Sequence, residues 1–505
     1  MNDNSGVPVS NFAALRDWLA KQRLQGQADD PTLKNSKPSS TTQVLERTSA
    51  DPQPTFSVSP DGSGDFTDIT SAVRKAPGGS RILVRPGRYQ EGIILEKPLE
   101  IVGDGSRQDI VIENPDTHCV LMQASHGAVR GLTVRSQGAS KGNKRSAVYI
   151  VQGTLLVEEC TLSSDTLAAI SVLGPSARPT LRGCRFVDSR SSGLLVADHA
   201  TATIEECEFL GNGEAGLLIR NEGNPVVRHC KFHNGKMFGL MVDQGGRGTI
   251  EECEFFKNEA AGVEISGGNP LIRNCTIHDE KIGILSYSDG TGTVENCDLT
   301  RNEIGVLIAE SGNPLIRTCH IHEGLVYGVS AKQKGRGIIE GCDIHDCAKA
   351  DIHIIEASIP IVRRCQLHDS PQFGVFVHAG GVGTIEECDI FAHGLAEIAV
   401  SEEGNPFIRQ CRLHDGKKFG LSVQLKGQAG VVDCEIFGNA LSGVLIRTGG
   451  DPVIRRCRIH RNMAEGVRVL ERGAGTFERC DLTGNAKGPW QIDKTSRVQK
   501  HGNME

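Results

Sequence analysis

The 505-residue chain has few aromatic residues and no long hydrophobic run. Phe, Trp and Tyr make up 4% of it and hydrophobic residues 38%, below the 45–50% typical of globular domains. So few aromatic side chains disfavour several separate globular cores, although the length alone suggests about three domains. No apolar stretch of about 20 residues is present, which excludes a transmembrane helix, and we expect no association with a membrane.

The chain also lacks a strong charge imbalance and a recognisable secretion signal. Its formal net charge is −7, whereas general nucleic-acid binders usually carry a basic field, so we expect no nucleic-acid partner. The first residues, MNDNSGVPVSNFAALRDW, contain no basic segment followed by an apolar one. Seventeen cysteines without such a signal are typical of a reducing compartment, which predicts a cytoplasmic protein.

The sequence does contain a repeat that is marked by cysteine. From Cys160 to Cys480, a cysteine recurs every 22 to 24 residues, and a fixed period in this range indicates a solenoid. An apolar residue stands three positions before each cysteine and another two positions after it, as Ile204 and Phe209 do around Cys207. Because three is an odd step, the first apolar residue and the cysteine both point inward only if the chain turns a corner just before the cysteine.

Each repeat also contains a Gly-apolar-x-apolar segment about nine residues after the cysteine, as at 216–219. Such short period-two segments, rich in β-branched residues and separated by Gly, Asn and Asp, predict strands and turns. Three short strands and three corners fit one repeat. We therefore predict an all-β fold, a single right-handed parallel β-helix solenoid of roughly seventeen coils stacked about 4.8 Å apart.

We predict four segments along the chain. Residues 1–55 comprise an amphipathic helix from Asn11 to Leu24 and a flexible linker, and the helix either docks on its own domain or binds a partner. Residues 56–118 form an N-terminal cap and the first coils, including a short helix with Asp65 as its expected N-cap. Residues 119–486 form the β-helix repeats. Residues 487–505 form a C-terminal cap, plugged by Trp490, and a tail that frays from about Thr495.

The position two residues before each cysteine alternates between Glu and Arg, and Val432 is the one exception among fifteen. In a parallel in-register stack each charge would lie between two opposite charges, so a slip by one coil would bring like charges together. We expect this ladder to fix the register of the coils. The cysteines should line an inward corner with parallel side chains that form no disulfides, and they lack the Cys-x-x-Cys spacing of a metal site.

Two resemblances follow from these residues. The stretch from Phe56 to Gly105, with DGSGDF, PGRYQE and IVGDG, resembles the opening of pectin-lyase-like β-helices, particularly pectinesterases. The double coils over roughly 177–486, with NPVVRHCKFHNGK and DPVIRRCRIHRN, are similar to the CASH-type repeats in the substrate-recruiting β-helix of F-box proteins. The second resemblance implies a recruiting platform. The F-box itself is not recognisable, so a ubiquitin-ligase role is not carried over.

The catalytic motifs of the related enzymes are not found. Pectinesterases use a Gln and two Asp on neighbouring coils, whereas residues 164–167 keep Asp165 without its Gln, and the Gly-His-Gly of polygalacturonase-like hydrolases is reduced to His126-Gly127. Glycosidic hydrolysis needs two carboxylates roughly 5–10 Å apart on one groove, and no such pair can be nominated. We therefore predict no catalytic residue and no cofactor, and an enzymatic activity stays open without being favoured.

The x position of the Gly-apolar-x-apolar segment should point outward, yet many of its residues are large and apolar. Contiguous exposed apolar area marks interaction sites, so this ladder predicts a protein-binding stripe. The alternative is that the side chains fold over their neighbours. The candidate residues are Leu195, Leu218, Met241, Leu285, Leu307, Phe376 and Leu445, together with the aromatic residues just before the glycine, Phe238, Tyr327, Phe373 and Phe419.

Histidines recur three residues after the cysteine, and His322, His345 and His368 lie on consecutive coils, where they could approach within about 5 Å. Asp346 and Asp369 follow two of them. We expect a ladder with local hydrogen bonds and predict no metal site, and the less favoured alternative is a metal or pH-sensing site.

These observations favour a non-enzymatic scaffold that recruits a protein partner through its outer β-helix face. The alternative is a carbohydrate-active protein that binds or modifies an acidic polysaccharide, and a third possibility is a structural spacer. Fold alone decides none of these.

Overall fold

The computed structural model describes residues 53–138 and 145–505 of the chain. The predicted helix between Asn11 and Leu24, and with it nearly all of the predicted N-terminal segment, lies outside the described residues. Residues Pro54–Glu505 form one compact unit. No helix among the described residues is long and apolar enough to span a membrane.

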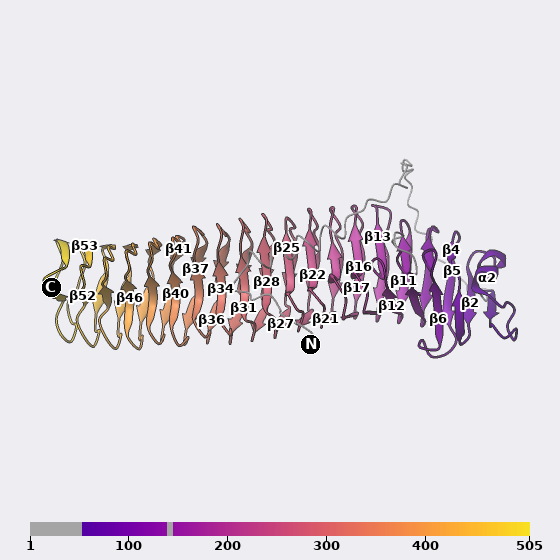
Figure 1. Ribbon diagram of the computed structural model, residues 1–505, viewed down its shortest axis with the longest axis horizontal. Helices are drawn as coiled ribbons and strands as arrows, with labels where there is room; N and C mark the ends of the chain where they lie inside the picture. Colours follow the sequence, from indigo (N-terminus) through magenta and orange to yellow (C-terminus); the bar gives the residue numbers. More distant parts are fainter. Residues whose placement is uncertain (1–52, 139–144) are drawn as a thin grey trace, which may run out of the picture. The chain divides into compact units, whose positions relative to one another are not determined.

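This unit is the predicted parallel β-helix. Each typical coil contributes one short strand to each of three sheets, as in β17 (Thr203–Glu205), β18 (Glu208–Leu210) and β19 (Ala215–Ile219). We call the sheets to which these three strands belong sheets A, B and C. Equivalent strands of successive coils pair in parallel and in register, for example Glu205 with Arg228. The coils therefore follow one another in chain order from α2 to the C-terminus (Figure 1).

The described residues form about 19 turns, so the expectation of roughly seventeen coils was too low. The additional coils lie at the ends, where no cysteine marks the repeat. At the N-terminal end, β1 (Thr55–Val58) and β2 (Ser80–Val84) already pair in sheet A. At the C-terminal end, β55 (Arg497–His501) pairs with β53 (Ala474–Glu478), so the tail that we expected to fray from about Thr495 is a further strand.

The predicted corner before each cysteine is confirmed. The residue that precedes the cysteine adopts the left-handed conformation, with φ of 54° at Glu206 before Cys207 and 53° at Asn274 before Cys275. This residue turns the chain from sheet A into sheet B, so that the apolar residue of sheet A and the cysteine both face the interior. A second left-handed residue, such as Asp279 with φ of 56°, ends the sheet B strand.

The core consists of ladders of similar side chains. The rings of Phe186, Phe209, Phe232 and Phe255 stack with centroids 4.5–4.7 Å apart. All seventeen cysteines are buried, and the Cys207 thiol lies 3.3 Å from the carbonyl oxygen of the residue two positions earlier. The coils therefore share one continuous core, in agreement with the low aromatic content, which disfavoured several separate globular cores.

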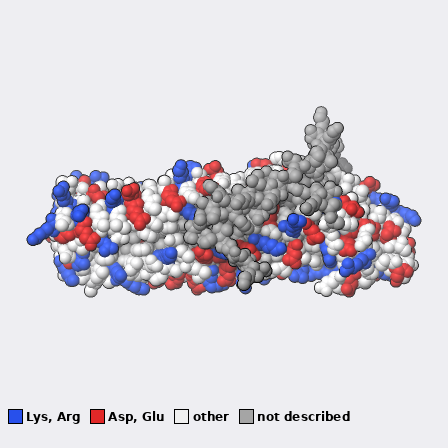
Figure 2. All heavy atoms as spheres, viewed as in Figure 1, with Lys and Arg blue, Asp and Glu red and all other residues white. Residues whose placement is uncertain are grey.

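The Glu–Arg ladder on the outside of sheet A is also confirmed. Arg228 lies 2.7 Å from Glu251 of the next coil. Val432 is aligned with Arg409 and Arg455, so one rung of the ladder is missing there. Acidic and basic side chains are interspersed over the face of the molecule in Figure 2.

A short helix, α2 (Ile69–Lys75), stands at the N-terminal end and buries its apolar side as predicted. Its N-cap is Asp68, which accepts a hydrogen bond from the Ser71 N–H at 2.7 Å. The expected cap, Asp65, was wrong, because its carboxylate instead accepts a 2.7 Å hydrogen bond from the Ser57 N–H and holds the first strand.

The C-terminal end contains Trp490, which the sequence nominated as a plug. β54 (Trp490–Ile492) pairs with β52 (Val467–Val469) in sheet C. The Trp490 ring meets Phe477 edge to face, with centroids 5.0 Å apart. Trp490 thus packs against the end of the buried core, as a plug would.

Candidate functional site

The outward ladder of sheet C is the surface that the sequence nominated for a protein partner. Its direction is as predicted, because Leu217 and Ile219 face the interior on either side of Leu218. Its exposure is not, since Leu218 is 4% exposed and Met241 1%. Six nominated side chains are buried: Leu218, Met241, Leu285, Leu307, Leu445 and Phe238.

This burial has a geometrical reason. The register aligns Leu218 with Leu195 on one side and Met241 on the other, and Leu285 with Leu307. Side chains in coils about 4.8 Å apart cover one another's flanks, so a run of large residues buries itself. The expected exposure of this stretch of the ladder was wrong, and a role for it in binding a partner stays a prediction.

The remaining nominated side chains are half-buried: Leu195, Phe376, Tyr327, Phe373 and Phe419. Three of the aromatic ones begin their strands, β34 (Tyr327–Ala331), β40 (Phe373–Val377) and β46 (Phe419–Val423). In register, Ala350 lies between the first two and Ala396 between the last two. Successive rings are therefore separated by one coil that carries only a methyl group.

Phe376 and two histidines pack around these rings. Ring centroids are 4.8 Å apart for Phe373 and Phe376, 4.2 Å for Phe376 and His378, and 4.0 Å for Tyr327 and His353. Burial lowers the pKa of His353 to about 3. Its ring is therefore neutral near pH 7, and it packs against Tyr327 as a buried, uncharged ring.

Exposed lysines border these rings. The Lys349 ammonium lies 5.9 Å from the centre of the Tyr327 ring, within the range of a cation–π contact. Lys418 directly precedes Phe419, and both lysines are exposed. We call Tyr327, Phe373, Phe376 and Phe419, together with Lys349 and Lys418, the aromatic face.

The outside of sheet B carries the predicted histidine ladder. The rings of His322, His345 and His368 stack with centroids 5.3 Å and 4.7 Å apart. Nδ1 of His345 lies 2.8 Å from a carboxylate oxygen of Asp346, and His368 pairs in the same way with Asp369. The expectation of local hydrogen bonds is confirmed.

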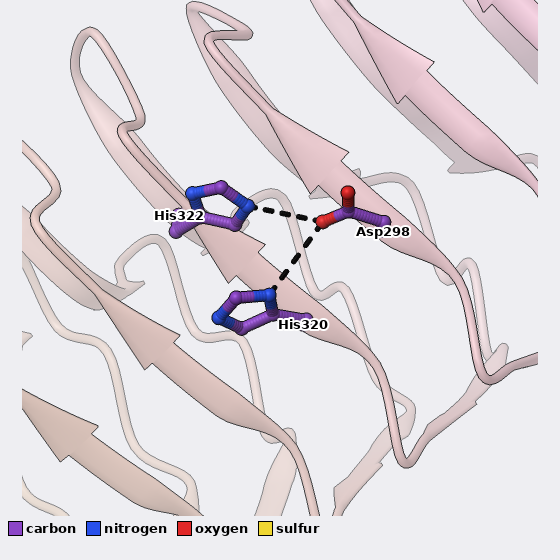
Figure 3. Close-up of side chains that lie close together, drawn as sticks. All are labelled: Asp298, His320 and His322. Carbon is purple, nitrogen blue, oxygen red and sulfur yellow. Dashed lines mark hydrogen bonds and ion pairs between the residues drawn. The ribbon is translucent and has the colours of Figure 1, made fainter.

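The structure adds His320, which the sequence analysis missed. Its Nε2 lies 2.8 Å from Nε2 of His345, and its Nδ1 lies 3.6 Å from Oδ1 of Asp298. The same Asp298 oxygen lies 3.0 Å from Nε2 of His322, so three side chains converge (Figure 3). A signal was present, since His320 and His322 flank Ile321 and alternate residues of a strand share a face.

A third cluster is buried at the corner between sheets B and C. Nε2 of His393 lies 2.8 Å from Oδ2 of Asp351, its Nδ1 contacts Glu397, and Ser370 donates a hydrogen bond to Asp351. The three ionisable side chains are 0% exposed. Burial opposes the charged imidazole, but the two carboxylates outweigh it and raise the pKa of His393 to about 9. Because the cluster is closed to solvent, it serves the fold.

A shallow pocket of about 390 Å³ is lined by Gly105, Arg107, Gly131, Glu159 and Gly183. Arg107 donates a 3.3 Å hydrogen bond to the backbone carbonyl of Glu159. The lining contains one carboxylate, so it does not supply the pair that glycosidic hydrolysis requires. The sequence motifs gave no indication of this pocket.

A family profile described as a right handed beta helix region matches the chain at residues 118–270, 168–313, 266–396, 304–429 and 352–504. These overlapping matches cover more than half of the chain. They agree with the coils seen in the structure and with the predicted right-handed path of the chain.

Two Arabidopsis thaliana proteins match over 135 residues, a probable pectinesterase/pectinesterase inhibitor 13 with 29% identity and a putative pectinesterase/pectinesterase inhibitor 45 with 27%. Each match covers 23% of this chain and 22% of the relative. Among solved structures, the catalytic domain of a GH87 alpha-1,3-glucanase is similar with 13% identity over 70% of this chain and 68% of that chain, at a TM-score of 0.39. The pectinesterase matches support the first resemblance, while the resemblance to F-box proteins stays a prediction.

Proposed function

Because the chain belongs to the family of right-handed β-helix proteins, we propose that it is a carbohydrate-active protein that binds an acidic polysaccharide along its outer surface. The observation that carries this proposal is the aromatic face, where partly exposed rings lie beside exposed lysines. We therefore favour carbohydrate binding, the alternative that the sequence left open, over a recruiting platform.

The spacing of the rings suits an extended polymer. Tyr327, Phe373 and Phe419 are each two coils apart, which corresponds to about 9.6 Å along the β-helix. This distance is similar to the length of two sugar units in an extended polysaccharide. A polymer lying along the axis could place every second sugar against a ring, with the alanines between the rings leaving room for the others.

The charges at this face favour an acidic polymer over a neutral one. Lys349 and Lys418 are exposed beside the rings, and a lysine ammonium is a compact point charge that attracts carboxylates without demanding one geometry. Phe376 stacks on His378, whose two ring nitrogens are held by His353 and Glu402. The rings would contribute contact with the sugars, and the lysines would select for acidic groups.

The pectinesterase relatives support a carbohydrate ligand, and pectin is the first polymer to test. Their support is limited to a short stretch, since this chain spans 22% of their length. The residues of the pectinesterase reaction are not recognisable around Asp165. We therefore propose binding, with no ester hydrolysis at that position.

The test is binding of polygalacturonate to the full chain, measured by isothermal titration calorimetry and by retardation in polysaccharide-containing gels. Dextran serves as the neutral polymer. We expect binding to polygalacturonate that weakens as salt rises, because exposed charges are screened, and little binding to dextran. The double variant Lys349→Ala/Lys418→Ala and the variant Phe376→Ala should each weaken binding.

Two matched variants serve as controls. Phe391→Ala removes a half-buried ring on the outside of sheet B, where it stacks on His368 with centroids 4.9 Å apart. Lys487→Ala removes an exposed lysine near the C-terminal end. Both should bind like the unmodified protein. Equal loss in the controls, or no binding of polygalacturonate by the unmodified protein, would contradict the proposal.

The recruiting platform remains a second candidate, because an exposed apolar patch lies where the chain enters sheet A. Ile359 is 51% exposed, Val382 38% and Phe407 43%. Ile359 and Val382 lie in neighbouring coils, since the Val382 N–H bonds the carbonyl beside Ile359. A protein that purifies with the unmodified chain should be lost from Ile359→Asp/Val382→Asp and kept by Phe376→Ala. Retention by the first variant would remove this patch as the contact.

A further inference from the structure

The outside of sheet B repeats one arrangement every two coils. A carboxylate next to the cysteine pairs both with a histidine of the next coil and with a Lys or Arg of an adjacent coil. Glu254, for example, lies 2.9 Å from Lys231 and 3.3 Å from His278. Each carboxylate is thus balanced by a permanent cation. The same arrangement recurs at Glu208, Asp389 and Glu435.

The arrangement changes at Asp298. Its register neighbours in the adjacent coils are Thr276 and His320, so neither is a Lys or an Arg. Asp298 faces two imidazoles instead, those of His320 and His322. One coil further, His345 occupies a position that is Phe in β24 (Glu254–Phe256) and β42 (Asp389–Phe391). Asp343 also lacks a Lys or Arg neighbour, since it lies between His320 and Gln366, so the departures from the repeat extend from Asp298 to Asp343 on both sides of His320.

The hydrogen bonds around His320 fix which of its nitrogens is free. Nδ1 of His345 lies 2.8 Å from the Asp346 carboxylate, which can only accept, so this nitrogen carries a proton. A neutral His345 then has a lone pair on Nε2, which accepts a hydrogen bond from Nε2 of His320 at 2.8 Å. The remaining lone pair of His320 is on Nδ1, and it faces Oδ1 of Asp298 at 3.6 Å.

Two electron-pair donors that face each other across such a gap can be bridged by a cation that binds to both. We propose that Asp298, His320 and His322 bind a divalent transition-metal ion of the zinc type, through Oδ1, Nδ1 and Nε2 respectively. This site is independent of the proposed polysaccharide binding, because it lies on sheet B and shares no residue with the aromatic face.

The distances fit such an ion. Zinc bonds to histidine nitrogen and carboxylate oxygen are about 2.0–2.2 Å, and tetrahedral angles then separate the donor atoms by about 3.3 Å. Oδ1 of Asp298 lies 3.0 Å from His322 and 3.6 Å from His320, and the three donor atoms lie within 4.8 Å of one another. Imidazole and carboxylate ligands suit Zn²⁺, Cu²⁺ and Ni²⁺, whereas Ca²⁺ and Mg²⁺ prefer oxygen alone.

The surroundings also suit a metal site. The Asp346–His345–His320 chain has the form of the carboxylate–histidine pairs that orient metal-bound imidazoles. His320 is 46% exposed and Asp298 47%, so an ion can enter from solvent and keep a water molecule as a further ligand. Competing thiols are out of reach, because all seventeen cysteines are buried.

The test measures metal binding to the full chain without an affinity tag. Zn²⁺ is titrated in competition with a chromophoric chelator, and Co²⁺ is titrated while its visible absorption is recorded. The decisive variant is His320→Lys, which installs the residue type found at Lys231 in the ordinary arrangement. We expect it to lose one Zn²⁺ per chain, or to weaken binding at that site more than tenfold, and to lose the Co²⁺ absorption. Asp298→Asn should have the same effect.

The matched control is His414→Ala. His414 lies 2.9 Å from Asp389, which also pairs with Arg412, so the ordinary arrangement should bind no ion and the control should keep the full metal content. Circular dichroism and thermal midpoints should be unchanged in His320→Lys, since its side chain is half exposed. The proposal is overturned if the unmodified chain and His320→Lys bind the same number of Zn²⁺ ions with the same affinity, or if His414→Ala loses as much.

Discussion

Two stretches of the β-helix build the corner between sheets B and C with different chemistry. From Asn439 to Asn485 the corner is a ladder of buried asparagines. The Asn462 amide donates to the Ile436 carbonyl at 3.2 Å, and its oxygen accepts from the Asn439 N–H at 3.1 Å. From Cys347 to Glu397 the asparagines are absent, and the same corner holds the buried Asp351, His393 and Glu397.

In both stretches, the size of one residue is matched to the size of its neighbour in the next coil. In the asparagine stretch, a glycine begins the turn into sheet C, and a Cβ on Gly443 would lie 2.6 Å from the Asn462 amide of the next coil. In the charged stretch this glycine is replaced by Asp351 and by Glu397, and the residue of the next coil shrinks to Ser370 and Gly416. The corner keeps its volume while its chemistry changes. Each asparagine forms hydrogen bonds with the asparagine of the next coil, whereas the buried charges are balanced only within the set of Asp351, His393 and Glu397.

The largest effect is expected from removing the central cation. His393→Ala leaves two buried carboxylates without their partner, and breaking a buried ion pair in this way costs about 3–5 kcal/mol. Asn462→Ala, which leaves neutral groups unsatisfied, should cost about 1–3 kcal/mol. Hydrogen exchange of amides in each stretch measures both losses locally, since a solenoid need not unfold in one step. Equal losses would remove the distinction between the two corners.

The charged corner should also weaken as pH rises, and the asparagine corner should not. The pKa of His393 is about 9 in the folded chain and 6.5 as the ordinary value. Its contribution is therefore complete below about pH 6.5 and is lost as pH rises through 9, a change of about 3 kcal/mol. Exchange of amides around His393 should accelerate relative to those around Asn462 between pH 6.5 and 9.5.

The control for this pH effect is the triple variant Asp351→Asn/His393→Asn/Glu397→Gln, which removes all three titratable groups, so that the difference between the two stretches should no longer vary over that range. Burial also raises the pKa of Asp351 and Glu397. These shifts act in the same direction, because each buried carboxyl group loses stability as pH rises through its folded pKa. A stability that increased with pH around His393 would contradict the arrangement.

Because neighbouring residues share one space at this corner, two substitutions there should have non-additive effects on stability. Gly416→Asn alone should be strongly destabilising, since a Cβ at Gly416 meets the Glu397 carboxylate. Glu397→Gly removes that obstacle, so the double variant should be more stable than the sum of the single effects by about 1–3 kcal/mol. Thermal unfolding of the four proteins measures this coupling. Additive effects would show that the two positions do not share one space.

The smallest effect is expected from a charge on the outside of sheet A, in the coil that leads into Asn439. Val432→Glu completes the ladder between Arg409 and Arg455 and should stabilise the chain by about 0–1 kcal/mol, because exposed ion pairs are weak. Val432→Arg should instead destabilise it slightly. A Val432→Glu effect as large as that of His393→Ala would mean that burial is not what separates the two kinds of charge.

The features of the fold that repeat in every coil could be predicted from the sequence. The inward cysteines, the corner before each of them and the Glu–Arg ladder follow from one constraint that many coils share. The end coils could not be counted, because β1 and β55 carry no cysteine. Asp351 and Glu397 did leave a signal, since each interrupts a column of glycines.

The candidate sites were harder to predict, because they depend on single residues that differ from the coil repeat and on neighbours that are distant in the sequence. His393 and Asp351 are 42 residues apart, and no local pattern joins them. Met241 was expected to be exposed because it points outward, but its burial depends on the size of the residues aligned with it in the coils above and below. His320 was overlooked because the histidines were sought only at the position three residues after each cysteine, whereas His320 directly follows Cys319.

The alternation of Glu and Arg outside sheet A has a consequence for how such a chain can change in length. Removing or adding one coil would place Arg beside Arg or Glu beside Glu at the junction, whereas removing or adding two coils restores opposite neighbours. A pair of coils can therefore be duplicated or deleted without electrostatic conflict in this ladder, while a single-coil change brings like charges together at the junction. Growth by pairs also copies the histidine–carboxylate arrangement of sheet B intact, so that one copy, such as the one at His320, is free to diverge while the others keep the fold.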